Sequence, residues 1–466
     1  MTTTTLPRRS RSGPRPRPRA ALVLPAAATL LALMNYTAPI ATLAATGADL
    51  GAGATAQVWI MSSISLGLAA ALLAVGSLAD DHGRRRVFVL GAAALAVSSV
   101  VCAAAPGSAV FVAGRVVQGA ASAGLLATGL GIIAAAFPPG PERTRATGTW
   151  GGMVGLGIAL GPIAAAALAL ADWRWWYWLT AAASVALAIT GRRTLPESRA
   201  ERRRGLDPAG LVTMVSGVAA LLTAVTLGRD GWDRPWVLGL LAAAAVLLAA
   251  FVAVQARVRE PMLDLRLFTR PSFLLSVTGA LVTGLAIIGI MSYLATVMVL
   301  GLGMSAVTAA FVLAVWSVLS WIGAVQARRL SARLSAGRLL AVALALNAAG
   351  ELAMLGLAPD TPWWRLVPGL ALAGVGSGLG NAMLARLAVE SVPADRASMG
   401  SGANNTARYI GAALGVAAVV AIAGATGGGT DAHALTRGTN TALLVSAVLA
   451  LLGAAFAALL RTERRA

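Results

Sequence analysis

Long apolar segments recur along the whole chain, and they limit its fold more than any other feature of the sequence. Apolar runs of about 18 residues or more alternate with short polar turns throughout the 466 residues. A helix of about 20 residues rises about 30 Å, which is the thickness of the hydrocarbon layer of a membrane. A soluble helical core does not need segments of this length. The sequence therefore predicts an all-α polytopic membrane protein.

The apolar runs predict about fourteen membrane-spanning helices. An even number of spans places both termini on the same side of the membrane. The apolar run that begins at Ala20 is longer than the core of a cleavable signal peptide, so we interpret it as a first span that is retained. The predicted spans cover residues 21–44, 56–78, 87–104, 109–137, 147–171, 175–190, 211–227, 236–256, 273–300, 305–327, 339–357, 366–389, 400–423 and 441–460.

The charged residues are few and unevenly placed. Only 12% of the residues are charged, yet the formal net charge is +19, and the arginines that supply it gather in alternate turns. Short cytoplasmic loops of membrane proteins carry an excess of basic residues, so this asymmetry places both termini in the cytoplasm. The same asymmetry accounts for the net positive charge, so a nucleic-acid partner is not needed to explain that charge. The arginine-rich turns lie in residues 84–86, 192–204, 257–270 and 328–338.

The chain offers few side chains for catalysis or metal binding. Its single cysteine, Cys102, cannot form an intrachain disulfide, and its two histidines, His82 and His433, fall in separate loops. The glycine-rich segment of residues 374–380 lacks a preceding strand and lies inside an apolar span, so we interpret it as a packing face and not as a phosphate loop. We therefore expect no cofactor, no metal and no enzymatic activity.

A dense charged turn, GSLADDHGRRR, joins the second and third predicted helices. The connection is short enough to make these helices antiparallel neighbours. At the inner membrane face, the Asp80 carboxylate can cap a helix N-terminus or pair with an arginine of another bundle. A solvated loop would explain the arginines but not the acid or the glycines. We predict a cytoplasmic gating loop, either a fixed or a moving clasp, formed by Gly76, Asp80, Gly83, Arg84 and Arg85.

This turn resembles the loop signature of the major facilitator superfamily, with Gly76-x-Leu78-Ala79-Asp80-x-x-Gly83-Arg84-Arg85 in the expected order. Four further stretches resemble elements of the same superfamily and of its fourteen-helix drug:proton antiporter branch. Arg115-Val116-Val117-Gln118-Gly119 is similar to the R-x-x-Q-G element of the fourth helix. Residues 172–176 resemble the W-R-W element after the fifth helix, and residues 405–415 resemble that branch's thirteenth helix. The antiporter signature G-x8-G-x3-G-P is similar to Gly148, Gly157, Gly161 and Pro162.

The resemblance covers nearly the whole chain outside the N-terminal tail, and it implies a fold and a function. The implied fold has two six-helix bundles plus two inserted helices. It divides the chain into a disordered basic cytoplasmic tail (1–19), an N-terminal bundle (20–192), a linker with two extra spans (193–270), a C-terminal bundle (271–461) and a second cytoplasmic tail (462–466). The tail of residues 1–19 is expected at an anionic membrane lipid surface.

The implied function is proton-coupled efflux of amphipathic small molecules, such as drugs, antibiotics or toxic metabolites, by alternating access. The expected partners are membrane lipid, protons and such a substrate, and the expected location is a bacterial cytoplasmic membrane, where the protein acts as a monomer. Two alternatives are a proton-coupled uptake symporter, which the antiporter signature disfavours, and a non-transporting polytopic membrane sensor.

The sequence also departs from the pattern of the superfamily. Asp81 stands where the loop signature usually has a basic residue, and Ala165 and Ala166 stand where the antiporter signature usually ends in two glycines. In the first helix, Asn35 occupies the region in which the branch typically carries an aspartate. The usual first-helix carboxylate is then missing, which favours neutral or weakly charged substrates.

Polar residues inside predicted spans are candidates for the mechanism, because a charge in the bilayer centre is costly and is kept only where it faces a cavity or a partner. Glu351 is the carboxylate placed most clearly inside a span; it either carries the coupled proton or reaches the outer interface from a helix end. Arg115 either tunes a protonated partner or holds helices together as a hydrogen-bond donor. The candidates for lining the substrate cavity are Asn35, Asn381, Asn404 and Arg408.

The antiporter helix carries Gly148, Gly157, Gly161 and Pro162. Proline removes one helical hydrogen bond, and glycines let a facing helix approach closely. These residues are predicted to form a hinge or a leak-tight seal between the bundles; ordinary tight packing is the alternative.

Overall fold

The computed structural model describes residues 18–201, 207–228, 231–427 and 431–460, and its regular elements there are helical. Residues 1–17 and 462–466 of the predicted tails lie outside the described residues. Four short elements of 3-10 or π type are η1 (Leu265–Thr269), η2 (Thr283–Ile288), η3 (Trp363–Leu366) and η4 (Ala394–Arg396). The α-helices are α1 (Pro18–Thr37), α2 (Pro39–Asp49), α3 (Ala54–His82), α4 (Arg84–Ala103), α5 (Ser108–Ala136), α6 (Pro141–Ala169), α7 (Arg174–Thr194), α8 (Pro208–Gly228), α9 (Pro235–Arg257), α10 (Pro271–Val282), α11 (Gly289–Leu300), α12 (Ala306–Ser331), α13 (Ala336–Ala353), α14 (Val367–Glu390), α15 (Ala397–Gly427) and α16 (Ala432–Leu459).

Thirteen helical segments of the described residues are long and apolar enough to cross a membrane. The predicted span at residues 175–190 corresponds to α7, which is less apolar because it includes Arg174, Arg192 and Arg193. This helix nevertheless packs along α4. The prediction of an all-α polytopic membrane protein is therefore confirmed.

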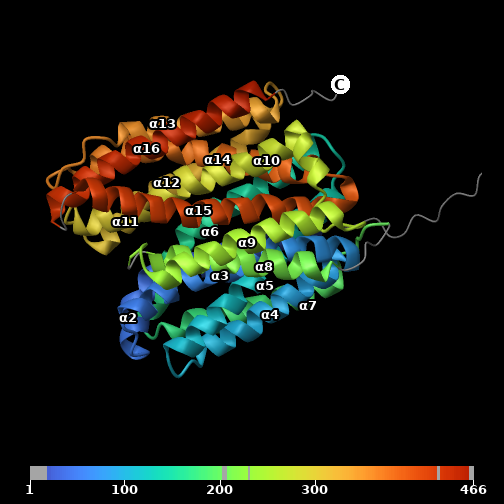
Figure 1. Cartoon of the computed structure of the whole chain (residues 1–466), viewed down its shortest axis with the longest axis horizontal. Coiled ribbons are helices and arrows are strands. Elements are labelled where there is room, and N and C mark those ends of the chain that lie inside the picture. The colour runs from blue at the N-terminus through green and yellow to red at the C-terminus, as the bar shows by residue number, and fades with distance from the viewer. Residues whose placement is uncertain (1–17, 202–206, 229–230, 428–430, 461–466) are drawn as a thin grey trace, which may run out of the picture.

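Two groups of helices lie side by side along the long axis of the molecule (Figure 1). We call α1 and α3–α7 the N-terminal bundle, and α10–α16 the C-terminal bundle. Within the first, α5 packs on α3 and α4; within the second, α14 packs on α12 and α13. The bundles meet mainly where α3 faces α15 and α6 faces α12. The domain boundaries that were expected from the sequence stay a prediction.

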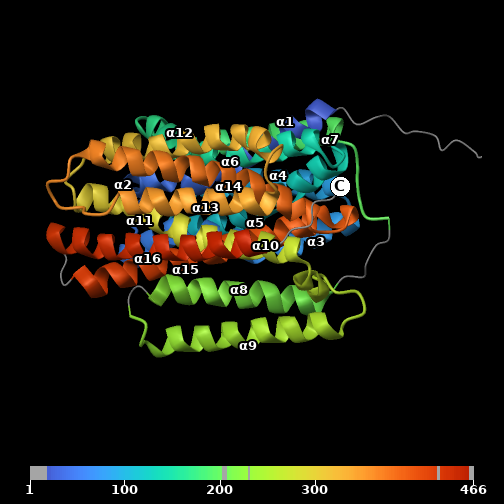
Figure 2. The same ribbon diagram turned by 90° about the horizontal axis from the view of Figure 1, so that it is seen from above.

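Helices α8 and α9 lie beside the two bundles as a separate layer (Figure 2). Helix α8 packs on α3 and more weakly on α15, so it covers the line where the bundles meet, and α9 packs on α8. Only 17% of the most apolar part of α9 is buried. An apolar helix with so little protein around it suits a position in contact with lipid.

The first predicted span, residues 21–44, is wrong as a single helix. Helix α1 ends at Thr37 and α2 begins at Pro39. Proline has no backbone N–H and its ring disturbs the preceding helical turn, so Pro39 begins a new helix at its first turn. The missing N–H of Pro39 leaves the carbonyl of Asn35 without its usual helical donor.

Most other predicted spans differ from the structure by a few residues at their ends, and three of the spans show the reasons or larger differences. Helix α16 begins at Ala432 and not at residue 441, because the Asp431 side chain accepts a hydrogen bond from Ala434 N at 3.0 Å and caps the helix. Helix α13 ends at Ala353, four residues before the predicted end. The predicted span of residues 273–300 contains a π-helical turn, η2, between α10 and α11.

One end of the molecule collects the arginine-rich turns, and we call it the basic end. It comprises the α3–α4 turn, the start of α6 and the turn between α12 and α13. The opposite end carries α2 and the last turn of α11 (Figure 1).

Candidate functional site

A buried polar cluster connects α1, α4, α5 and α7 inside the N-terminal bundle. Arg115 Nη1 donates to the main-chain oxygen of Asn35 at 2.9 Å and to Gln118 Oε1 at 3.0 Å. The Asn35 side-chain oxygen accepts from Trp176 Nε1 at 3.2 Å and from Arg115 Nη1 at 3.3 Å. Gln118 Nε2 donates to Ser99 Oγ at 2.9 Å. Two of the sequence-predicted site residues, Asn35 and Arg115, are therefore direct neighbours.

The position of Pro39 explains why Arg115 binds the backbone of α1. In a regular helix the N–H of residue 39 would bind the carbonyl of Asn35, and proline cannot supply it. The guanidinium takes this carbonyl instead. Its Nε and Nη2 atoms, and Nδ2 of Asn35, are buried without a hydrogen-bond partner. Within the described residues no carboxylate pairs with Arg115, so neutral oxygens alone hold a fully buried cation.

A second polar group lies in the C-terminal bundle. Arg408 Nη2 donates to Asn381 Oδ1 at 2.5 Å, which joins α15 to α14. Asn404 Nδ2 donates to the main-chain oxygen of Ser276 at 2.8 Å and to its hydroxyl at 2.9 Å, which joins α15 to α10. The Nε atom of Arg408 is buried without a hydrogen-bond partner. Each of these three predicted cavity residues is therefore held by a neighbouring helix of its own bundle.

An aromatic contact between the bundles lies next to both polar groups in the sequence. Tyr36, which follows Asn35, contacts Tyr409, which follows Arg408, with ring centroids 5.8 Å apart. Tyr36 Oη also accepts a hydrogen bond from Ser65 Oγ at 3.1 Å. The structure thus places the predicted cavity residues on both sides of one aromatic contact, although it does not bring Asn35 into contact with the three residues of the other bundle.

Glu351 lies in the last turn of α13, nearer to the helix end than its predicted position two thirds of the way along. Its side chain is nevertheless fully buried, and both carboxylate oxygens lack a hydrogen-bond partner. Glu351 is thus both a helix-end residue and a buried acid. An ionised carboxylate without a partner is very unfavourable in such surroundings, whereas a protonated one needs only a single acceptor.

The α3–α4 turn contacts the other bundle at the basic end. The Asp80 carboxylate is fully buried and accepts hydrogen bonds from Ser398 N at 3.1 Å and from Met399 N at 2.8 Å. These are the first N–H groups of α15, which have no helical acceptor of their own. Asp80 therefore caps the N-terminus of α15, where the helix dipole also favours a negative charge.

Two ion pairs extend this contact. Arg84 is buried and lies 2.8 Å from Asp80, and its Nη2 donates to the main-chain oxygen of Asp395 at 3.1 Å. Asp81, which departs from the usual loop signature, pairs with Arg396 of the other bundle at 2.9 Å. The charged turn thus holds the start of α15 through two carboxylates and one arginine. We call this set, together with Arg396, Ser398 and Met399, the clasp.

Two glycines allow the clasp to form. A side chain on Gly76 would collide with the main-chain oxygen of Ser398, so glycine lets α3 approach α15. Gly83 has a φ of +115°, which L-residues rarely adopt, and a Cβ there would lie 2.7 Å from Glu197 Cδ. Glu197 Oε1 in turn accepts from Arg85 N at 3.0 Å. The segment that follows α7 therefore covers the outer side of the turn.

The antiporter helix, α6, uses its first half for contacts between the bundles. A Cβ on Gly148 would lie 3.1 Å from the main-chain oxygen of Ala324 on α12, and one on Gly151 would lie 2.9 Å from Ala382 N on α14. Such close approach leaves little room for a water-sized pathway between the helices. These contacts, like the clasp, lie in the half of the molecule nearest the basic end, so that end is closed in this structure.

The second half of α6 packs within its own bundle. Gly157 and Gly161 lie against α1, where added Cβ atoms would meet the main-chain oxygens of Leu30 and Met34. Pro162 leaves the carbonyl of Ile158 without a helical donor, and Thr37 Oγ1 lies 3.3 Å from that oxygen. These three residues therefore join α6 to the end of α1, directly beside Asn35 in the sequence.

The chain matches the family described as Major Facilitator Superfamily over residues 26–416, which is most of its length. The chain belongs to this superfamily. It is accordingly a transporter and not an enzyme. The resemblance drawn from the charged turn and the antiporter signature is confirmed.

Several relatives in the superfamily are named as drug or antibiotic exporters or resistance proteins. A "Probable actinorhodin transporter" of Streptomyces coelicolor is 32% identical over 83% of this chain and 68% of its own. The "Puromycin resistance protein pur8" of Streptomyces alboniger is 30% identical over 91% of this chain and 85% of its own. The "Multidrug efflux pump LfrA" of Mycolicibacterium smegmatis is 30% identical over 85% and 79%.

Solved structures of the superfamily share the fold. The human organic anion transporter MFSD10 superposes with a TM-score of 0.68 at 19% identity, over 95% of this chain and 100% of its own. The proton:xylose symporter XylE superposes with a TM-score of 0.69 at 14% identity, over 94% of each chain. At these identities the likeness concerns the fold alone.

Sequence reasoning missed several residues that the structure places in these contacts. Ser398, Met399 and Arg396 complete the clasp, although they lie more than 300 residues from the turn that they bind. Trp176 and Gln118 belong to stretches that resemble superfamily elements, and this was a signal for the polar cluster around Arg115.

Proposed function

We propose that this member of the superfamily exports amphipathic small molecules from the cytoplasm in exchange for protons, by alternating access. The single observation that carries the proposal is the pair of buried arginine groups, one in each bundle, on either side of the Tyr36–Tyr409 contact. Polar and cationic side chains are kept in the middle of a membrane domain where they serve a substrate or a proton path. The names of the relatives support efflux as the direction.

The basic end faces the cytoplasm in this proposal. The excess of arginine in alternate turns supports this orientation, since basic residues are retained on the cytoplasmic side. Both termini then lie in the cytoplasm of a bacterial cell in this proposal. Because the basic end is closed, the present structure corresponds to the outward-facing state of the proposed cycle. In that state substrate leaves to the outside, or protons bind from the outside.

The moving units are proposed to be the two bundles, residues 20–192 and 271–461. Opening the basic end requires Asp80 to release Ser398 N and Met399 N, and Asp81 to release Arg396. These interactions are charge-assisted hydrogen bonds, which have a defined geometry and form or break as a unit. The gating loop is therefore proposed as a moving clasp that closes when the start of α15 returns to it.

Glu351 is the proposed proton carrier. Asp80 and Asp81 are held by arginines and helix N–H groups, whereas both oxygens of Glu351 lack a partner. A carboxyl group in this position holds its proton while the site is dry and can release it when the bundle opens and water reaches the site. Arg115 cannot be deprotonated, so its proposed role is to hold α1, α5 and α7 together and to bind the polar part of a substrate.

The charge of the pathway favours uncharged or acidic substrates over dications. Arg115 and Arg408 are buried cations without a carboxylate partner among the described residues, and Asn35 stands where a carboxylate would balance the first of them. Two unit charges 6 Å apart interact by about 3 kcal/mol at an effective dielectric constant near 20. A cationic substrate close to Arg115 would be repelled by an amount of this order.

Accumulation of fluorescent amphipathic dyes and labelled antibiotics tests the proposal in an efflux-deficient bacterium that expresses this chain. The panel includes neutral, acidic and dicationic compounds, each with and without an uncoupler. Lower accumulation of neutral or acidic compounds, restored by the uncoupler, is the expected result. Higher accumulation in expressing cells would contradict export, and an effect that survives the uncoupler would contradict proton coupling.

A further inference from the structure

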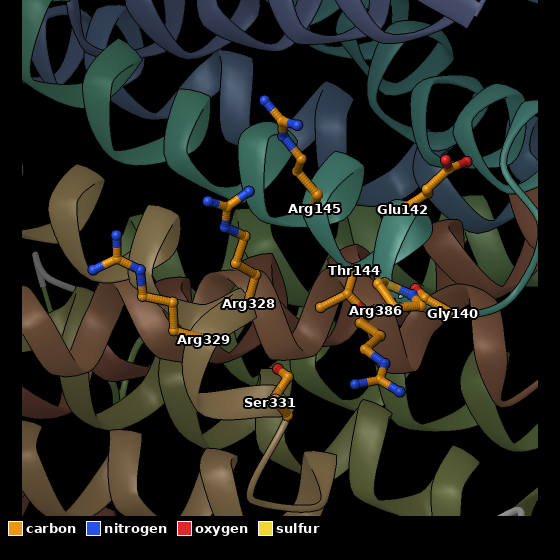
Figure 3. A pocket seen from close by; sticks show the side chains of 10 residues that line it. Gly140, Glu142, Thr144, Arg145, Arg328, Arg329, Ser331 and Arg386 are labelled. Carbon is orange, nitrogen blue, oxygen red and sulfur yellow. Dashed lines mark hydrogen bonds between the residues drawn. The ribbon is translucent and has the colours of Figure 1, made fainter.

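A cleft of 560 Å³ lies at the basic end, between the first turn of α6 and the last turn of α12 (Figure 3). It is separate from the polar groups around Arg115 and Arg408. Four of its lining residues are arginines, against one lining carboxylate, Glu142. The cleft joins the two bundles, because Arg145 comes from α6 whereas Arg328 and Arg329 come from α12 and Arg386 from α14.

Three of these arginines are available to a ligand. Arg386 pairs with Glu390 at 2.8 Å. Within the described part of the chain, Arg145, Arg328 and Arg329 form no ion pair, and all three side chains are exposed. Guanidinium groups from two directions around one cleft match the oxygens of a phosphate group, which accept several charge-assisted hydrogen bonds at once.

The start of α6 adds to this positive potential. Its N-cap residue is Gly140, which provides no side-chain hydrogen bond to the first turn, and Pro141 follows it. The positive end of the helix dipole therefore points toward the cleft. Because the N-cap residue is a glycine, no capping carboxylate neutralises this end. Glu142 in the first turn offsets only part of the four arginines.

The depth of the cleft in the membrane indicates that its phosphate ligand belongs to a lipid and is not a free phosphate. The cleft lies where the candidate membrane spans Pro141–Ala169 and Thr308–Ser331 of the structure reach their ends, which is the depth of lipid headgroups. Below it, α12 presents exposed apolar side chains, among them Val318, Ile322 and Val325. An acyl chain can follow this face while its headgroup occupies the cleft. A free phosphate would make no use of the apolar face.

We propose that this cleft binds the phosphate headgroup of an anionic phospholipid, which bridges the two bundles. Arg145 on one side and Arg328 with Arg329 on the other hold the headgroup. The bridge lies next to the contact of Gly148 with Ala324, so a bound lipid stabilises the closed basic end. Opening of that end separates Arg145 from α12 and releases the lipid.

Lipid retention measured by native mass spectrometry tests the proposal on the full chain, purified in a mild detergent and titrated with phosphatidylglycerol. The double variant Arg328→Gln/Arg329→Gln removes two cleft charges, and Arg145→Gln removes one from the other bundle. The control Arg333→Gln/Arg338→Gln removes two exposed arginines of the neighbouring turn and α13 that do not line the cleft. Basic residues near an anionic lipid headgroup each contribute to its binding, so the double cleft variant is expected to bind about tenfold more weakly or worse.

Three results would overturn the proposal. An equal loss in the control pair would show that surface charge in general attracts the lipid. Unchanged retention in both the double variant and Arg145→Gln would show that the headgroup binds elsewhere. Displacement of the lipid by glycerol phosphate or inorganic phosphate at the same concentration as the lipid would make a soluble phosphate the ligand. A melting temperature within the range of the control pair shows that the cleft variants are folded.

Discussion

The buried arginine of the N-terminal bundle is the residue whose surroundings define the site. Arg115 is bound by an amide side chain, a backbone carbonyl and a glutamine, and by no carboxylate among the described residues. A charge at the bilayer centre costs about 2.5 to 3.5 kcal/mol on insertion scales. Neutral acceptors offset part of this cost but leave a net positive charge, which an acidic substrate or a substrate carbonyl can approach.

Asn35→Asp is expected to place a carboxylate 3.3 Å or closer to Arg115 Nη1 and to form a buried ion pair. Because the net charge of the cluster falls from +1 to 0, repulsion of a cation 6 Å away drops by about 3 kcal/mol at an effective dielectric constant near 20. Export of monocationic and dicationic dyes should rise, as measured by their accumulation in cells. Asn405→Asp, whose amide binds only its own helix, is the control. Unchanged cation accumulation in the Asn35→Asp variant would count against the assignment of Asn35 to the position of the usual first-helix carboxylate.

Glu351→Gln is expected to abolish proton-driven export while the protein remains folded in the membrane. Glutamine keeps the size of the side chain and tolerates burial, but it cannot carry a proton. Efflux that an uncoupler abolishes measures proton coupling. Exchange of substrate without a pH gradient measures substrate binding and movement apart from that coupling. Glu390→Gln, which removes a carboxylate that pairs with Arg386 near the membrane surface, should leave coupling intact. Full activity of the Glu351 variant would remove this residue from the mechanism.

Four helices make the main contacts that close the basic end in this structure. Helix α3 meets α15 through Gly76 and the clasp, and α6 meets α12 through Gly148 and the glycines that follow it. Glycine at these points lets main chains touch, so each pair has one close-packed arrangement and separates as a rigid unit. The clasp adds directional hydrogen bonds at the tip of this contact.

Asp80→Asn is expected to weaken the clasp, because it leaves buried Arg84 without its carboxylate and removes the negative charge from the N-terminus of α15. Breaking a buried ion pair from one side costs about 3 to 5 kcal/mol. The open population should rise at least tenfold. A cysteine at Ser398, which is fully buried here, reports it by its labelling rate with an impermeant maleimide in inside-out vesicles.

The native Cys102 is buried and adds little background to this labelling. Asp395→Asn provides a matched control, since it removes a carboxylate of the same region that makes no ion pair with the clasp arginines. Equal labelling rates at position 398 in the Asp80 variant and the unchanged chain would contradict the role of the clasp.

Gly76→Ala is expected to separate α3 from α15, because the new methyl group would overlap the main-chain oxygen of Ser398. Overpacking of this kind costs about 1 to 3 kcal/mol. Gly239→Ala on α9 is the matched control, since an added Cβ there meets no atom nearby. Replacing a helical glycine by alanine in open space stabilises a helix by roughly 0.5 to 1 kcal/mol. The thermal unfolding midpoint should therefore fall for the first variant and hold or rise for the second; equal midpoints would argue against a tight contact.

The helices of this molecule could be predicted from their apolar runs, because lipid requires about 20 apolar residues in each span. Their ends were harder: Pro39 starts a new helix inside a continuous apolar run, and Asp431 starts α16 nine residues early through a side-chain cap. The partners of Asp80 could not be predicted. Ser398 and Met399 contribute only backbone N–H groups, which carry no sequence signal, and they meet the turn only after both bundles fold.

The whole molecule is a pair of helical bundles closed at one end and joined there by charges. The basic end holds the clasp, the glycine contacts of α6 and the arginine cleft, and in the proposed cycle all three change together when the bundles rock. Helices α8 and α9 cover the α3–α15 line on one side. The proposed cycle then needs one further event, protonation of a carboxylate, to decide which end is open.

The most direct test of proton-coupled export uses the purified chain in proteoliposomes that contain a pH-sensitive dye. An active substrate from the accumulation panel is added in the absence of an imposed pH gradient, and internal pH is followed as the substrate moves. We predict that protons move opposite to the substrate, and that Glu351→Gln abolishes the proton movement. Protons that move in the same direction as the substrate, or substrate movement without any change of internal pH, would contradict the account.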